Sequence, residues 1–348
     1  MKTSSLALCC IAGSLLFSVP AGASTDLSVG PFTLKFFNQG DTLNNPAEGA
    51  SVPVSRTFTG SEMAAFVEGA QFWADRLAAS DTSGSLILGA AFLPDASGSA
   101  YNVTPGSDTH PNGRFYNYLT TGTKDATDEL YGFDSLIVVQ FEYPPIVSHN
   151  IVSPLSMTGT VMHEMGHAFG IFVTMEEKEE SGSKYWKFAA DGAMNNWTKG
   201  LVDVFGKQAA PDMKLAISAV DVADSFVILP QDTTPAAFKY PTFHGTEVDA
   251  LTLNPATGVS EGMAVMAGRL LYDTSGNPAG YGFDGGNTLG HSGIMNSLMS
   301  YGAIQNIPFT EVELAMLQDL GYTIDRSQFY GKSILFTPAS PVTNGIAF

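Results

Sequence analysis

Two histidines and a glutamate are spaced so that they can bind and use one metal ion. His163, Glu164 and His167 form the pattern H-E-x-x-H. Residues four apart lie on the same face of a helix, so both imidazoles can reach a single ion. Glu164 lies about 100° further round the helix, close to a water on that ion. The pattern predicts a zinc site whose bound water has a pKa of about 7 and loses its proton to Glu164 as it attacks a carbonyl.

The residues around this pattern favour a buried helix. Its neighbours are apolar or small: Val161, Met162, Ala168, Phe169 and Ile171. Gly170 stands where a helix can end and the chain can turn. We therefore expect a helix over residues 156–172 in the floor of an active site. The alternative is a buried amphipathic helix whose two histidines are satisfied by hydrogen bonds.

A catalytic zinc ion needs a third protein ligand. Four histidines remain outside the pattern: His110, His149, His244 and His291. The first two lie beside a proline and an asparagine and are most simply surface residues. His244 and His291 are the candidates, and Asp191 is a carboxylate at a plausible distance that we rank below both.

A second motif follows His291. Residues 163–170 read H-E-x-x-H-x-x-G, and Met299 stands eight residues after His291 in the run Ser297-Leu298-Met299-Ser300-Tyr301. Together these motifs resemble metzincin zinc peptidases with a long insertion before the third histidine, as in the leishmanolysin-like group and secreted bacterial relatives. The common metzincin pattern has that histidine six residues after the second, where this chain has Val173.

The resemblance implies roles for three residues of the last third of the chain. His291 is implied as the third ligand, with His244 as the alternative, and Met299 as the methionine of the Met-turn beneath the metal. Met295 is a rival for that turn, but the run around Met299 fits better. Tyr301 is implied to lie near the zinc and to donate a hydrogen bond to the developing oxyanion. Its alternative is a buried core tyrosine with a satisfied hydroxyl.

Residues 1–23 have the parts of a signal peptide. Lys2 precedes an apolar run, and Ala21-Gly22-Ala23 is a small-residue site that predicts cleavage after Ala23. The expected product is secreted, periplasmic or on the cell surface. Both cysteines, Cys9 and Cys10, lie in this segment, so the mature chain has neither a disulfide nor a cysteine nucleophile.

The charge of the chain excludes some partners. The formal net charge is −18, and it becomes −19 when Lys2, the one charged residue of the signal peptide, is removed. An acidic surface argues against nucleic acid and anionic membranes, which attract basic patches. No later stretch is apolar for the 18 residues that suggest a membrane span.

The elements before the zinc motif predict an α+β fold with a mixed, twisted sheet. Strands are expected at residues 31–37, 86–93 and 135–143. Thr59 and Glu62 have capping-box spacing and open a helix that runs to about residue 79. With the zinc helix, this gives a metzincin-like N-terminal catalytic subdomain over residues 24–172.

The chain after the motif is richer in loops. Residues 173–330 are expected to form a C-terminal subdomain of loops and short strands, followed by a tail at residues 331–348. Thr310 and Glu313 form a second capping box, which predicts a final helix over residues 311–320. The run Asp284-Gly285-Gly286-Asn287 suggests calcium, although a plain turn fits the same residues better.

These features predict a secreted zinc endopeptidase that acts on protein or peptide substrates, with Glu164 as the general base. One alternative is a non-catalytic, zinc-stabilised surface or adhesion module. Glu164 argues against it, because a structural zinc site closes its fourth position with a ligand and needs no base. The other alternative is a zinc hydrolase that acts on amides outside proteins. The helix motif alone is compatible with this activity as well.

Overall fold

The computed structural model describes most of the chain between residues 24 and 324. The described ranges are 24–45, 50–77, 86–93, 100–103, 111–122, 132–139, 157–218, 220–228, 240–266, 269–272, 278–282, 288–293, 297–299 and 310–324. The predicted signal peptide and the predicted tail at residues 331–348 lie outside these residues.

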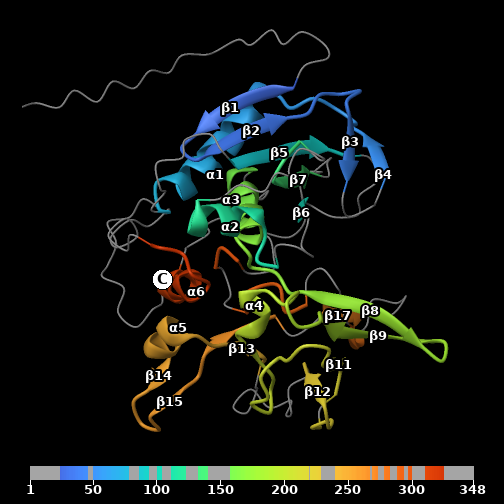
Figure 1. Cartoon of the computed structure of the whole chain (residues 1–348), viewed down its shortest axis with the longest axis vertical. Helices are drawn as coiled ribbons and strands as arrows, with labels where there is room; N and C mark the ends of the chain where they lie inside the picture. Colours follow the sequence, from blue (N-terminus) through green and yellow to red (C-terminus); the bar gives the residue numbers. More distant parts are fainter. Residues whose placement is uncertain are drawn as a thin grey trace, which may run out of the picture.

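A five-stranded mixed sheet forms the upper part of the molecule (Figure 1). Its order is β1-β2-β5-β7-β6, with the three central strands parallel and the two end strands antiparallel to their neighbours. The strands are β1 (Thr25–Val29), β2 (Phe32–Phe36), β5 (Leu86–Phe92), β7 (Ser135–Val139) and β6 (Ala100–Val103). The mixed α+β fold that the sequence predicts is therefore present.

Both faces of this sheet are buried, because the residues of its strands alternate between two apolar clusters. Phe36 packs edge to face on Phe66 of α1 (Gly60–Ala74), in the larger cluster. Phe37 packs on Phe133 in a smaller cluster that also includes Leu43, from the hairpin of β3 (Thr42–Asn45) and β4 (Ala50–Pro53).

Three helices lie on the side of the sheet with the larger cluster (Figure 1). They are α1, α2 (Arg114–Thr121) and α3 (Met157–Ala168). The capping box at Thr59 and Glu62 is present, as predicted, but α1 ends at Ala74. The apolar pattern continues to Leu77 because that residue is also buried, in a β-bridge with Ile324 rather than in the helix.

The lower part of the molecule consists of small sheets and short helices (Figure 1). A four-stranded sheet contains β8 (Met175–Glu180), β9 (Ser183–Phe188), β11 (Lys214–Ala216) and β12 (Ser225–Val227). A three-stranded sheet contains β10 (Leu201–Val202), β13 (Thr242–Phe243) and β16 (Met263–Ala264). Two further hairpins are β14 (Leu253–Asn254) with β15 (Val259–Ser260) and β17 (Arg269–Tyr272) with β18 (Pro278–Gly282).

Three helices belong to this lower part: α4 (Asn196–Lys199), α5 (Thr246–Leu251) and α6 (Glu311–Asp319). The second predicted capping box, Thr310 with Glu313, opens α6. Gly321 follows with φ +109°, a left-handed conformation that suits glycine where a helix ends. Among the described helices, none has the length and apolar character to cross a membrane.

The sequence prediction differs from the structure in the polar stretch between β5 and β7. No element is predicted there, yet the stretch contains β6 and α2. The charged run at residues 176–180 belongs to strand β8, whose residues 177–180 are exposed to solvent. Strand β6 is four residues long and carries only a short apolar signal, but it lies beside α3 and takes part in the candidate site.

Candidate metal centre

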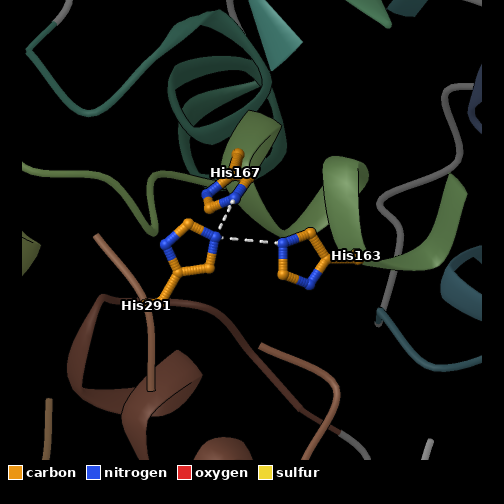
Figure 2. A group of neighbouring side chains, drawn as sticks. All are labelled: His163, His167 and His291. Atoms are coloured by element: carbon orange, nitrogen blue, oxygen red, sulfur yellow. Dashed lines mark hydrogen bonds between the residues drawn. The ribbon is translucent and has the colours of Figure 1, made fainter. Parts of the chain in front are cut away.

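His163 and His167 lie on one face of α3, and the opposite face fixes this helix to α1. Gly69 of α1 packs so closely on Val161 that a Cβ there would lie 2.8 Å from the valine Cγ1. The indole N–H of Trp73 donates to the Met162 carbonyl at 3.0 Å. The buried side of α3 is thus anchored, and the two imidazoles point toward His291 (Figure 2).

His291 approaches from the lower part of the chain and faces both imidazoles (Figure 2). Its Nε2 lies 3.2 Å from Nε2 of His163 and 3.2 Å from Nε2 of His167. Three nitrogens held tetrahedrally about 2.0–2.1 Å from zinc would be about 3.3 Å apart. The three histidines therefore form a group that could hold a metal ion.

Hydrogen bonds at the far side of two rings prepare them as ligands. Nδ1 of His163 lies 2.7 Å from the Leu298 carbonyl oxygen, and Nδ1 of His167 lies 2.6 Å from that of Ile171. A carbonyl oxygen accepts only, so each Nδ1 carries the proton and each Nε2 presents its lone pair. Burial lowers the pKa of both imidazoles, to about 3 for His167, which keeps them in the neutral form that binds metals.

Glu164 is buried beside the three histidines and is held from the neighbouring strand. Its side chain is 6 % exposed, and its carboxylate accepts the backbone N–H of Asn102 in β6. Burial raises the pKa of Glu164 to about 8 in the metal-free protein. A cation held by the three imidazoles favours the ionised carboxylate and so opposes this shift. The group is therefore suited to taking and giving a proton near neutral pH.

The raised pKa predicts how the metal-free protein responds to alkaline pH. Because the folded protein holds the Glu164 proton more tightly than the unfolded chain, its stability is full below pH 4.5 and falls as pH rises through about 8. Glu164→Gln should flatten the decline in the free energy of unfolding between pH 7 and about 8, by at most about 1.4 kcal/mol per pH unit. Above that pKa the carboxyl is ionised in both states of the wild type, so its decline levels off. Urea unfolding of both chelator-treated proteins measures this difference, and parallel curves would contradict it.

A strained turn presents His291 to the other two histidines. Leu289, two residues earlier, is fully buried and has φ +61°, which is rare for a residue with a branched side chain. The turn is held in place because the Leu289 N–H donates to the Met266 carbonyl and the Leu289 carbonyl accepts the indole N–H of Trp197 at 2.7 Å. Strain that the surrounding structure fixes in this way is typical of functional sites.

Trp197→Phe should therefore weaken metal binding without touching a ligand. The phenyl ring keeps most of the packing against Phe243, but the buried Leu289 carbonyl loses its donor. We expect a loss of about 1–3 kcal/mol in unfolding free energy and a metal affinity 10–100-fold lower. Denaturant unfolding and competition with a chromophoric chelator measure the two effects. A variant with reduced stability but unchanged affinity would show that Trp197 does not position His291.

Met299 lies directly beneath α3. It is fully buried, and a Cβ at Gly166 would overlap its sulfur, so only glycine permits this approach between the two helical histidines. The Met299 carbonyl accepts the N–H of Ser292, next to His291. Its own N–H donates at 2.9 Å to Glu313, the buried capping-box glutamate of α6. The described part of the predicted Met-turn thus connects α3, the His291 segment and α6.

The other predicted ligands lie elsewhere or outside the described residues. His244 is bonded through Nδ1 to Asp249 and through Nε2 to Thr242, and it is not part of the three-histidine group. Asp191 is exposed in a turn. Residues outside the described ranges are Tyr301, Met295, His110, His149 and the run Asp284-Gly285-Gly286-Asn287.

Three residues of the centre were missed in the sequence. Asn102 acts through its backbone N–H, which leaves no trace in the residue type. Trp197 acts through its indole N–H on a carbonyl 92 residues away, and the sequence predicts Glu313 only as a helix cap. The capping box does carry a usable signal, because a glutamate at N3 of a buried helix has acceptor capacity beyond its own cap.

Comparisons of the chain with protein-family models, with curated proteins and with solved structures give no match. The function therefore has to be inferred from the chemistry of the site itself.

Proposed function

We propose that the protein is a secreted, zinc-dependent endopeptidase of the metzincin type. The observation that carries this proposal is the meeting of three imidazole nitrogens beside a buried glutamate. The third imidazole comes from a segment 124 residues after His167. Secretion rests on the signal-peptide pattern of residues 1–23. The metzincin assignment rests on the H-E-x-x-H-x-x-G motif, on His291 and on Met299 beneath α3.

Zinc suits the donors of this site. Three neutral imidazoles, with nitrogen separations of 3.2 Å where they are measured, match a tetrahedral ion that keeps one position for water. When bound, such an ion lowers the pKa of its water to about 7 and polarises a substrate carbonyl.

The protein's own contribution to the reaction is proton transfer by Glu164. Its carboxylate takes the proton of the attacking water and then gives it to the nitrogen of the departing amine. The hydrogen bond from the Asn102 N–H restrains the carboxylate that makes this transfer. Because Glu164 and His291 are both less than 10 % exposed, bulk water is largely kept from the reacting groups.

The position of β6 favours a peptide over another amide. This strand ends the five-stranded sheet, and the Asn102 N–H donates to Glu164. A strand at the end of a sheet can pair with an extended peptide through main-chain hydrogen bonds. A peptide aligned with β6 would bring its carbonyl groups past the glutamate and the three histidines.

The role of a purely structural zinc site is less well supported. A structural site has four protein ligands, and the group found among the described residues has three. It also has no need of Glu164, whose burial costs stability when the carboxylate ionises.

Metal removal tests the proposal. The mature protein, residues 24–348, should cleave unfolded casein, lose all cleavage after dialysis against a zinc chelator, and regain it when one equivalent of zinc is added back. Cobalt is a useful second metal, because it takes the same geometry and reports it in visible absorption. A protein that binds one equivalent of zinc and cleaves neither casein nor a mixed peptide library would contradict the proposal.

A further inference from the structure

Thr160 lies on the face of α3 that carries the candidate ligands, one turn before them. It precedes His163 by three residues, Glu164 by four and His167 by seven, and these spacings share one side of a helix. Helical side chains lean toward the N-terminus, so those of His163 and Glu164 extend over the turn that contains Thr160. The contact with α1 is made by the neighbouring side of the helix, where Val161 and the Thr158 carbonyl lie against Gly69.

The hydroxyl of Thr160 is buried and makes no hydrogen bond to the residues that the structure describes. The residue is 5 % exposed, and its Oγ1 has no partner within the part of the chain that the structure describes. Nearby threonines behave differently: Thr158 donates to Glu68 at 2.9 Å, and Thr174 bonds to Thr198 at 3.1 Å. A buried hydroxyl without a partner destabilises a fold, so its presence beside a reaction centre points to a partner that arrives with a ligand.

We propose that Thr160 determines substrate specificity by forming a hydrogen bond with a neutral polar side chain next to the scissile bond. The inference rests on the proposed peptidase function. A hydroxyl can donate and accept, so it suits the hydroxyl of serine or threonine and the amide of asparagine or glutamine. An acidic side chain would be repelled by the ionised Glu164 one turn away. An apolar side chain would leave the Thr160 hydroxyl buried and unpaired in the complex. Because an unpaired buried polar group weakens binding, the site would discriminate against substrates with such a side chain.

The test compares pairs of peptides that have nearly the same shape. They are fluorogenic peptides built on a casein sequence that the protein cleaves, with Thr or Val, Asn or Leu, and Gln or Met at each position flanking the scissile bond. In the wild type, kcat/KM should be about 10-fold higher for the polar member of each pair at one of these positions. Thr160→Val should abolish or reverse this preference, and Thr160→Ser, which keeps the hydroxyl, should retain it.

A second measurement does not depend on hydrolysis. If the hydroxyl has no partner in the ligand-free protein, the isosteric Thr160→Val should raise the urea midpoint of unfolding, whereas Thr160→Ser should not. A lower midpoint for Thr160→Val overturns the inference, because the hydroxyl then has a partner within the fold.

Other outcomes are also decisive. An equal loss of kcat for all peptides in Thr160→Val makes Thr160 a positioning residue for Glu164 and overturns the role in specificity. If the wild type cleaves the peptides but shows no preference for the polar member of any pair, the role of Thr160 in specificity is also overturned. The proposed peptidase function then still stands. A wild type that binds zinc but cleaves none of the peptides overturns the proposed function, and this inference with it.

Discussion

Glu164→Gln is expected to reduce kcat/KM for peptide hydrolysis by about 10²–10⁴-fold while the protein still binds one equivalent of metal. The amide has nearly the same shape and still accepts the Asn102 N–H through its carbonyl oxygen. It cannot take a proton from the attacking water, so the reaction loses its base. Because the three imidazoles are unchanged, metal affinity should stay close to that of the wild type.

Three measurements are needed: metal content by elemental analysis, affinity by chelator competition, and kcat/KM on a fluorogenic peptide. Glu177→Gln is a matched control, because Glu177 lies on the exposed strand β8 and pairs with Lys184 there. This control should keep full activity. If Glu164→Gln cleaved peptides at the wild-type rate with metal bound, another group would be the base and the role proposed for Glu164 would be wrong.

The local parts of the fold could be predicted from sequence because their signals are local. Both capping boxes place a threonine three residues before a glutamate, and both open helices in the structure. The spacing of His163 and His167 predicts both the helix and the side of it that faces the metal. Even here the ends differ, since α3 stops at Ala168, where the predicted helix continued to residue 172. Gly170, with φ +96°, makes the turn just beyond.

The non-local parts could not be predicted in the same way. The order of the sheet, with β6 inserted beside β7 at its end, depends on pairing between segments more than 30 residues apart. No pattern within Ala100–Val103 shows that one of its backbone N–H groups reaches Glu164. The same applies to Trp197, whose residue type suggests only core packing. Its partner carbonyl is 92 residues away.

The third histidine is an intermediate case. Its residue type makes His291 a candidate, but His244 offers the same imidazole, and in the sequence only the resemblance around Met299 separates the two. In the structure both nitrogens of His244 are engaged by Asp249 and Thr242, while His291 faces the pair on α3 (Figure 2). The geometry therefore selects His291 rather than His244 as the third member of the group that could hold a metal ion.

His291→Ala should abolish specific metal binding and, with it, all hydrolysis. Removing one of three ligands leaves two imidazoles on a helix, a pair that holds zinc far more weakly than a complete site. The loss in affinity should exceed the 10–100-fold that removal of a supporting hydrogen bond costs. Because metal binding favours the folded state, the rise in melting temperature that zinc gives the wild type should disappear in the variant.

His244→Ala provides the matched control for this prediction. It removes an imidazole of equal ligand strength from the same part of the chain, and it breaks only the bonds to Asp249 and Thr242. We expect His244→Ala to lose some stability and to keep its metal, so that the two alanine variants differ in metal content rather than in folding. The reverse result, metal lost from His244→Ala and kept by His291→Ala, would assign the third ligand to His244. The strained turn at Leu289 would then hold His291 for a purpose other than metal binding, and the proposal of a zinc peptidase built on these three histidines would fail.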